Sequence, residues 1–252
     1  FQNYVVPDER SAAFFGLGIA EQVKAPVALI CTSGSAVLNY APAISEAYYR
    51  QIPLVVVSAD RPSEWIDQGD GQTIRQNGTL SNFIGLAIEL LENPIAKDKL
   101  WYNECQLNEV GFQLSQPEKK PIHINFPFTE PLYGQQAIEN LPRIRKAHFR
   151  QTSEVLDLGD LRQLQEKWQQ AKKKMIICGQ MPKNGPLNQL LADLSKDASV
   201  AVLIENTSNL SHTNFIACID RTLNSISEDQ IEHYTPDLLI TIGGAVVSKR
   251  IK

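Results

Sequence analysis

The chain has 252 residues, of which 43% are hydrophobic, and its formal net charge at pH 7 is −4. This length and composition are typical of a globular protein with room for two α/β domains. The sequence has neither a dense basic stripe nor a long apolar stretch, so nucleic acid and membrane are not expected as partners.

The first half of the sequence alternates apolar strands with helices. The strands lack polar alternation and are separated by helical segments, which predicts a parallel sheet covered on both faces. A polar loop rich in Gly, Asp and Gln interrupts the pattern from about residue 63 to 78. The predicted strands are residues 4–6, 27–31, 53–58 and 121–127, and the predicted helices are residues 11–22, 35–50 and 99–114.

The second half repeats this pattern after a polar, irregular connection. The composition predicts one domain over residues 1–134, a linker over 135–154 and a second domain over 155–252. Both domains are expected to be doubly wound parallel sheets of the α/β class, with ligand-capable loops after the carboxyl ends of their strands. In the second domain, the predicted strands are 175–179, 200–204 and 237–244, and the predicted helices are 158–172 and 184–197.

The four cysteines are widely spaced, and none forms a CxxC pair. A zinc site is therefore not expected, and a reducing cytoplasmic location is favoured. The sequence begins at Phe1 rather than at a methionine and ends just after a predicted strand. We therefore expect it to be a piece of a longer protein.

Glu9 is the first functional candidate. It lies in a charged cluster between an apolar segment and a helix of small residues, where burial would raise the proton affinity of a carboxylate. A structural alternative is that Glu9 caps the following helix or pairs with Arg10. Further along, the apolar strand 27–31 ends in Thr32-Ser33-Gly34, a turn of the kind that presents backbone N–H groups to a ligand.

Several motifs, taken in order, resemble the thiamine-diphosphate enzymes, and most closely the menaquinone-pathway members of that family. The carboxylate and the Thr-Ser-Gly turn alone are typical of the whole family. The later motifs are more specific to the menaquinone pathway. The motifs are Asp8-Glu9-Arg10, Thr32 to Asn39, Ser58 to Pro62, Gly71 to Gln76, His123 to Gly134 and Ser248-Lys249-Arg250.

The resemblance implies a three-domain enzyme of which this sequence holds two parts. These are a pyrimidine-binding domain that lacks its first loop, and part of a Rossmann-like middle domain. The cofactor would be thiamine diphosphate with Mg²⁺, whose ligands would lie in a third domain outside this sequence, so no metal ligand is expected here. The family resemblance also implies a homodimer or homotetramer with active sites between subunits.

The resemblance further implies a reaction and a set of site residues. The substrates would be 2-oxoglutarate, which is decarboxylated, and isochorismate, to which the succinyl unit is added. Glu9 would be the catalytic residue, because it would share a proton with N1′ of the cofactor's pyrimidine. The other cofactor-binding residues would be Thr32, Ser33, Gly34 and Asn39. The substrate-binding residues would be Arg61, Gln72, Lys249 and Arg250, with Arg75 and Gln76 as neighbours.

Other interpretations remain open. The chain could belong to another thiamine-diphosphate enzyme of 2-oxo acids, such as an acetolactate synthase, although its arginines and lysine favour dicarboxylate substrates. It could also be a non-catalytic Rossmann-like module with Gly243-Gly244 near a phosphate, although a lone glycine pair is a weak signal. Arg61 could be a surface arginine, Lys249-Arg250 a solvated helix start, and His123 a structural residue.

Overall fold

The computed structural model describes residues 2–92, 96–129, 144–150 and 155–251. The chain divides into two compact units, Phe1–Thr152 and Ser153–Lys252. Each unit is built on a sheet whose described strands all pair in parallel, which confirms the predicted fold class. Among the described residues, no helix combines the length and hydropathy needed to span a membrane.

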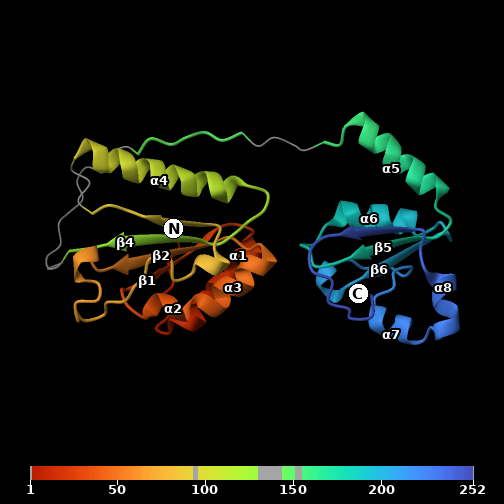
Figure 1. The fold of residues 1–252 in the computed structure, drawn as a ribbon, viewed down its shortest axis with the longest axis horizontal. Coiled ribbons are helices and arrows are strands. Elements are labelled where there is room, and N and C mark those ends of the chain that lie inside the picture. The colour runs from red at the N-terminus through yellow and green to blue at the C-terminus, as the bar shows by residue number, and fades with distance from the viewer. Residues whose placement is uncertain (1, 93–95, 130–143, 151–154, 252) are drawn as a thin grey trace. The chain divides into compact units, whose positions relative to one another are not determined.

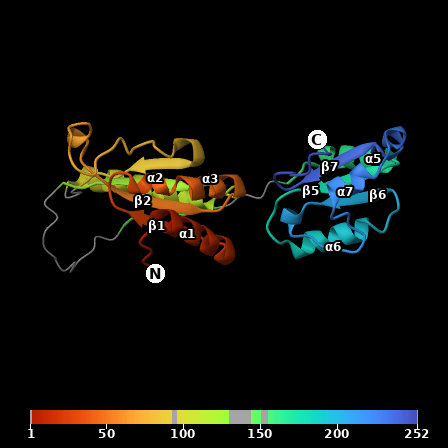
Figure 2. The same cartoon turned by 90° about the horizontal axis from the view of Figure 1, so that it is seen from below.

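The first unit has a four-stranded sheet in the order β1-β2-β4-β3. Helix α4 covers one face of this sheet, and α1, α2 and α3 cover the other (Figures 1 and 2). The strands are β1 (Val27–Cys31), β2 (Leu54–Asp60), β3 (Leu86–Glu89) and β4 (Ile122–Pro127). The α-helices are α1 (Glu9–Val23), α2 (Ala36–Asn39), α3 (Ala41–Arg50) and α4 (Lys97–Ser115), and short 3₁₀ turns lie at Ser63–Trp65 and Ser81–Phe83.

Strand β2 shows why the sheet is covered on both faces. Its residue Val56 packs into a core formed with α1 and α3, whereas the next residue back, Val55, packs into a second core that includes Val110 of α4. Successive strand residues point to opposite faces, so an unbroken apolar run requires helices on both sides.

Two predicted elements of the first unit are wrong or incomplete, and one strand was not predicted. The segment 4–6 is not a strand, and Val5 is 95% exposed. Strand β3 was not predicted, because four residues with one buried member give little period-2 signal. The predicted helix 35–50 is divided into α2 and α3 at Tyr40, with Pro42 in the first turn of α3, where proline lacks only an N–H that has no helical partner.

Helix α1 begins two residues earlier than predicted. Asp8 is its N-cap, and the Asp8 carboxylate accepts hydrogen bonds from the backbone N–H of Ser11 at 3.0 Å and from its hydroxyl at 2.8 Å. These bonds hold the pKa of Asp8 below its usual range. Asp8 therefore does the capping, and the capping alternative for Glu9 is wrong.

The second unit has a three-stranded sheet in the order β6-β5-β7. Leu191 of α6 packs on one face with Ile176 and Val202, and Ile219 of α7 packs on the other with Ile177 and Leu203. The elements are α5 (Leu158–Gln170), β5 (Lys174–Cys178), α6 (Gly185–Leu194), β6 (Val200–Ile204), α7 (Ile219–Asn224), α8 (Ile231–Tyr234) and β7 (Leu238–Ile242), with 3₁₀ turns at Asn206–Ser208 and Glu228–Gln230.

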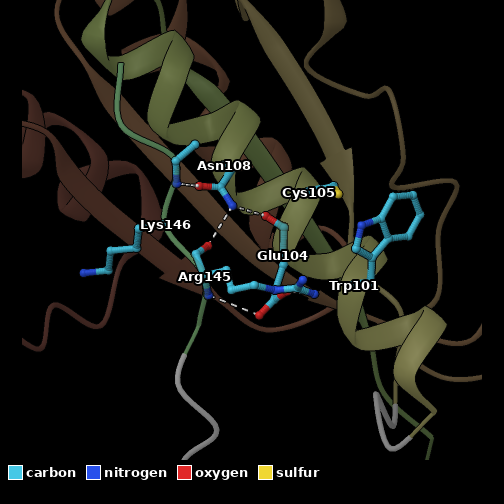
Figure 3. A pocket seen from close by; sticks show the side chains of 7 residues that line it. Trp101, Glu104, Cys105, Asn108, Arg145 and Lys146 are labelled. Carbon is cyan, nitrogen blue, oxygen red and sulfur yellow. Dashed lines mark hydrogen bonds and ion pairs between the residues drawn. The ribbon is translucent and has the colours of Figure 1, made fainter. Parts of the chain in front are cut away.

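The predicted connection 135–154 lies largely outside the described residues, as do residues 130–134 of the motif His123 to Gly134. The described part of this connection, residues 144–150, runs along α4 (Figure 3). Glu104 accepts hydrogen bonds from the backbone N–H and the side chain of Arg145, and Asn108 accepts one from the N–H of Ala147 at 2.7 Å. The N–H of Arg145, followed by its guanidinium, holds the pKa of Glu104 below its usual range. This segment is therefore anchored to the first unit.

Candidate functional site

The carboxyl ends of β1, β2 and β4 meet at one edge of the first sheet. Cys31 pairs with Ser58 in the parallel register, and Ser58 pairs in turn with Asn125. Polar residues that follow these strands are therefore brought to a common edge, which is where doubly wound sheets bind their ligands.

Glu9 lies in the first turn of α1, close to the end of β1. It is half-buried rather than fully buried as expected, because the preceding segment is not a strand that could cover it. Burial, together with a smaller contribution from the nearby negative charge of Glu9, raises the pKa of the Cys31 thiol to about 11. Burial also raises the pKa of Tyr40, to which Glu9 again contributes. The Glu9 carboxylate is therefore a close neighbour of the residues at the end of β1.

The turn that follows β1 combines an exposed and a buried part. Thr32 is exposed, whereas Ser33 and Gly34 are buried. Gly34 has a φ of +86°, in the left-handed region that favours glycine. A Cβ atom at Gly34 would lie 3.1 Å from the carbonyl oxygen of Gln72, so the loop that carries Gln72 lies directly against this turn.

Gln76 connects this turn to the sheet. Its side chain is fully buried, and its Oε1 accepts a hydrogen bond from the Gly34 N–H at 3.0 Å. Its Nε2 donates to the Ala59 carbonyl oxygen at 2.7 Å and to Asn125 Oδ1 at 2.9 Å. All three bonds join segments far apart in sequence.

Asn125 is the centre of a buried polar network at the same edge. Its Oδ1 also accepts a bond from the Ser58 hydroxyl at 2.9 Å, and its Nδ2 donates to Asp60 Oδ2 at 2.7 Å and to Glu89 Oε2 at 3.2 Å. The Ser58 hydroxyl lies 2.7 Å from Nε2 of His123. Since the single hydroxyl proton is donated to Asn125, Nε2 of His123 must carry the proton in this contact.

His123 is a structural residue, as one alternative held. Burial lowers its pKa from 6.5 to about 4, so folding excludes the proton that the unfolded chain binds below pH 6.5. We expect the free energy of unfolding to fall as the pH drops from 6.5 to 4. At about 1.4 kcal/mol per pKa unit, the loss is about 3 kcal/mol. Urea unfolding across this range should show a flatter pH dependence for His123→Gln, and no flattening for the exposed control His148→Gln.

The loop after β2 holds Arg61 and Gln72. Arg61 is partly buried, and its Nε lies 3.6 Å from Asp70 Oδ2 within the same loop. Gln72 is exposed, with a φ of +53°. Arg75 is exposed and donates to Asp67 at 2.8 Å. The structure thus brings Gln72 against the turn at Gly34, and keeps the Arg75 side chain in a surface ion pair.

Asn39 lies at the last position of α2 and is exposed. Its Nδ2 donates to the Ser35 carbonyl oxygen at 3.2 Å, a bond local to its own helix. That bond stabilises the short helix after the turn at Gly34.

Lys249 and Arg250 belong to the second unit, and both are exposed. The segment that carries them is held by two carboxylates. Glu205 accepts bonds from the N–H groups of Val247 and Ser248 at 2.9 and 2.7 Å. Asp220 accepts bonds from the Ser248 hydroxyl and from the Arg250 N–H, and these bonds hold its pKa below the usual range.

A separate pocket of about 310 Å³ lies beside α4, where the anchored segment 144–150 passes (Figure 3). It is lined by Trp101, Glu104, Cys105, Asn108, Arg145, Lys146 and Ala147. Glu104, Asn108 and Arg145 bond to one another along the wall, and Trp101 projects from α4 at the side. None of the predicted site residues lines this pocket.

The residues that hold the site together were not predicted from the sequence. Asn125 and Asp60 were passed over, and Gln76 was named only as a neighbour of the substrate residues. The available signal was their placement, because Asp60 and Asn125 are polar positions near the carboxyl ends of mostly apolar strands. Within the described ranges, no cluster of three or more His, Cys, Asp or Glu residues is arranged to hold a metal ion.

Comparisons with known proteins place these features in context. Residues 1–79 match the family model described as the thiamine pyrophosphate enzyme N-terminal TPP binding domain. A solved structure assigned to the thiamin diphosphate-dependent enzymes, from Mycobacterium smegmatis, matches with a TM-score of 0.62 and 14% identity. That match covers 94% of this chain and 44% of the solved one, and at this identity it supports the fold alone.

Curated relatives match over nearly the whole chain. A 2-succinyl-5-enolpyruvyl-6-hydroxy-3-cyclohexene-1-carboxylate synthase from Flavobacterium psychrophilum is 46% identical over 100% of this chain and 44% of its own length. Proteins of the same name from Christiangramia forsetii and Porphyromonas gingivalis are 42% and 40% identical, over 99% and 100% of this chain and 46% and 43% of their own lengths. The chain therefore spans less than half the length of the curated relatives it matches.

Proposed function

The chain belongs to the 2-succinyl-5-enolpyruvyl-6-hydroxy-3-cyclohexene-1-carboxylate synthase family of thiamine-diphosphate enzymes, and from this we propose what the complete protein does. It decarboxylates 2-oxoglutarate and adds the succinyl unit to isochorismate, giving the compound for which the family is named. This is a transferase reaction of menaquinone biosynthesis. The observation that carries the proposal is the identity of 37–46% over 98–100% of the chain to relatives that share one name.

The carboxyl edge of the first sheet fits the pyrimidine ring of thiamine diphosphate. The half-buried Glu9 offers a carboxyl group, and the exposed Thr32 beside the buried Gly34 offers polar groups next to a backbone without a side chain. When bound, the cofactor supplies the carbanion chemistry that decarboxylation of a 2-oxo acid requires. Glu9 would hold a proton shared with N1′ of the ring, Thr32, Ser33 and Gly34 would line the ring, and Asn39 would stabilise the helix behind them.

The substrates are polyanions, so we propose cationic and amide side chains as their partners. Arg61 and Gln72 belong to the loop that lies against the turn Thr32-Ser33-Gly34, which we call the cofactor turn. Lys249 and Arg250 belong to the second unit. An arginine can bind a carboxylate through two parallel hydrogen bonds, which also fixes the orientation of the substrate. Arg61 is half-buried, which strengthens such a charged contact relative to one in open solvent.

The remaining parts of the proposal come from the family. Residues 1–134 would form the pyrimidine-binding domain and residues 155–252 part of the middle domain, with residues 135–154 as the connection between these two domains. Mg²⁺ would bind the diphosphate in the part of the relatives that this chain does not cover. The complete protein would be a cytoplasmic homodimer or homotetramer with small molecules as its substrates.

The function is tested on the complete protein supplied with thiamine diphosphate, Mg²⁺ and 2-oxoglutarate. We expect CO₂ release that increases when isochorismate is added, together with a product of the expected mass. Release of CO₂ from pyruvate instead of 2-oxoglutarate would favour an acetolactate-type enzyme. Calorimetry that detects no cofactor binding at all would favour a non-catalytic module and contradict the proposal.

Arg61→Ala separates a substrate role from a structural one. We expect KM for 2-oxoglutarate to rise about 10- to 100-fold, since hydrogen bonds to charged groups are worth about 1.5–3 kcal/mol, while the Kd for thiamine diphosphate changes little. Steady-state kinetics and calorimetry on the complete protein measure the two quantities. The exposed arginine of α5 provides the control, as Arg162→Ala. Equal losses in KM and Kd would mean that Arg61 only supports the loop.

A further inference from the structure

Gln76 occupies a position that neither cofactor nor substrate can reach. Its side chain is fully buried. Each of its hydrogen bonds goes to a different part of the site: the Gly34 N–H of the cofactor turn, the Ala59 carbonyl at the end of β2, and Asn125 of β4. A buried amide with its donors and acceptor paired is costly to remove, because its partners are then left unsatisfied.

Gln76 also lies on the loop that carries the proposed substrate residues. Gln72 is four residues away, and its backbone lies against Gly34. At the other end of the loop, the Arg61 N–H donates to Asp60 Oδ1 at 2.8 Å, and Asp60 is bonded to Asn125. Gln76 and Asn125 thus belong to one hydrogen-bonded network, which joins the cofactor turn to both ends of the loop 61–76. We call this loop the substrate loop.

We propose that Gln76 is a positioning residue that couples the cofactor turn at Gly34 to the substrate loop 61–76. This inference rests on the proposed function. Gln76 fixes the Gly34 backbone relative to β2 and β4, and holds Gln72 at the turn. If it is lost, cofactor affinity and substrate affinity fall together, because neither segment is then held in place. Gln76 itself contacts neither molecule, which distinguishes it from Arg61 and Gln72.

The test compares Gln76→Met with Gln68→Met in the complete protein. Both replace an amide of the same loop by an apolar side chain of similar length, but Gln68 is exposed. Hydrogen exchange is measured on the peptide that covers residues 32–38, without any ligand. The Kd for thiamine diphosphate and KM for 2-oxoglutarate are then measured. In Gln76→Met we expect exchange at Gly34, and both constants, to rise roughly tenfold, in keeping with the loss of buried hydrogen bonds.

The three readouts keep the coupling distinct from the proposed function. If the wild-type protein does not turn over 2-oxoglutarate, the function fails, while the exchange measurement still tests whether Gln76 holds Gly34. Unchanged exchange in Gln76→Met would overturn the proposal, as would a rise in KM alone, which would make Gln76 a substrate contact. Gln68→Met is expected to match the wild type in all three readouts.

Gln76→Glu covers the case in which Gln76→Met does not fold. A protonated glutamic acid can accept from Gly34 and donate one of the two hydrogen bonds that the amide donates, whereas the carboxylate can only accept. The titratable groups around it are Asp60 on β2, Glu89 on β3 and His123 on β4, with Arg61 and Asp70 in the loop. The buried site and the neighbouring carboxylates favour the protonated form at low pH. We expect its cofactor affinity, relative to the wild type, to be partly restored at pH 5.5 and lost at pH 8. A deficit equal at both values overturns the proposal.

Discussion

Glu9→Gln is expected to reduce kcat of the complete protein by about 10²- to 10⁴-fold, the range that proton transfer by a positioned side chain contributes. The substitution keeps the volume of the side chain but removes the acid that shares a proton with N1′ of the pyrimidine. The fold should be preserved, because Asp8 rather than Glu9 caps α1. Single-turnover decarboxylation of 2-oxoglutarate measures the effect, and thermal unfolding confirms that the protein is intact.

The neighbouring carboxylate provides the matched control. Asp8→Asn makes the same change from acid to amide one residue earlier, and asparagine is as good an N-cap as aspartate. We expect this variant to keep near-normal turnover and stability. Near-normal activity in Glu9→Gln would contradict the cofactor assignment at this edge of the sheet. Equal losses in both variants would show that the charge of the helix start matters rather than the proton on Glu9.

Gly34→Ala is expected to destabilise the protein and to weaken cofactor binding. At a φ of +86° a side chain is strained, and the added Cβ would lie 3.1 Å from the Gln72 carbonyl oxygen. Strain of this kind costs about 1–3 kcal/mol, and the turn would also move from the position that Gln76 fixes. Urea unfolding and the Kd for thiamine diphosphate measure the two effects.

Gly18→Ala is the control for this substitution, with the opposite expected sign. Gly18 lies within α1, and a Cβ there would meet no other atom within 4 Å. Alanine is the better helix former, so the free energy of unfolding should rise by about 0.5–1 kcal/mol. If Gly34→Ala behaved like Gly18→Ala, the turn after β1 would not depend on its glycine.

Most of the fold could be predicted because its strands are apolar on both faces. Strand β6 (Val200–Ile204) matches its prediction residue for residue. The ends of β4 and β7 lie within two residues of the predicted ends. Segment 4–6 shows where this reasoning fails. Tyr4 and Val5 have the composition of a strand, but none of the strands in the described part of the chain pairs with them. Pairing is a property of the folded sheet, and local sequence does not carry it.

The candidate site was predicted less completely than the fold. Glu9 and Thr32-Ser33-Gly34 could be found because they follow or precede recognisable elements. Asn125 and Gln76 lie 49 residues apart in the sequence, and only the folded chain shows that their amides bond to each other. A buried polar residue is recognised by its partners, and those partners come from other strands. Glu9 is likewise only half-buried because segment 4–6 does not form the predicted strand, which only the structure shows.

The high pKa of the Cys31 thiol has a chemical consequence for the edge at which Glu9 lies. At a pKa of about 11, only a minute fraction of this sulfur is thiolate at neutral pH, and the thiolate is the form that reacts with oxidants and electrophiles. The exposed Cys105 and Cys218 lie elsewhere on the two units. An alkylating dye can therefore be attached to them while the sulfur beside Glu9 stays unmodified.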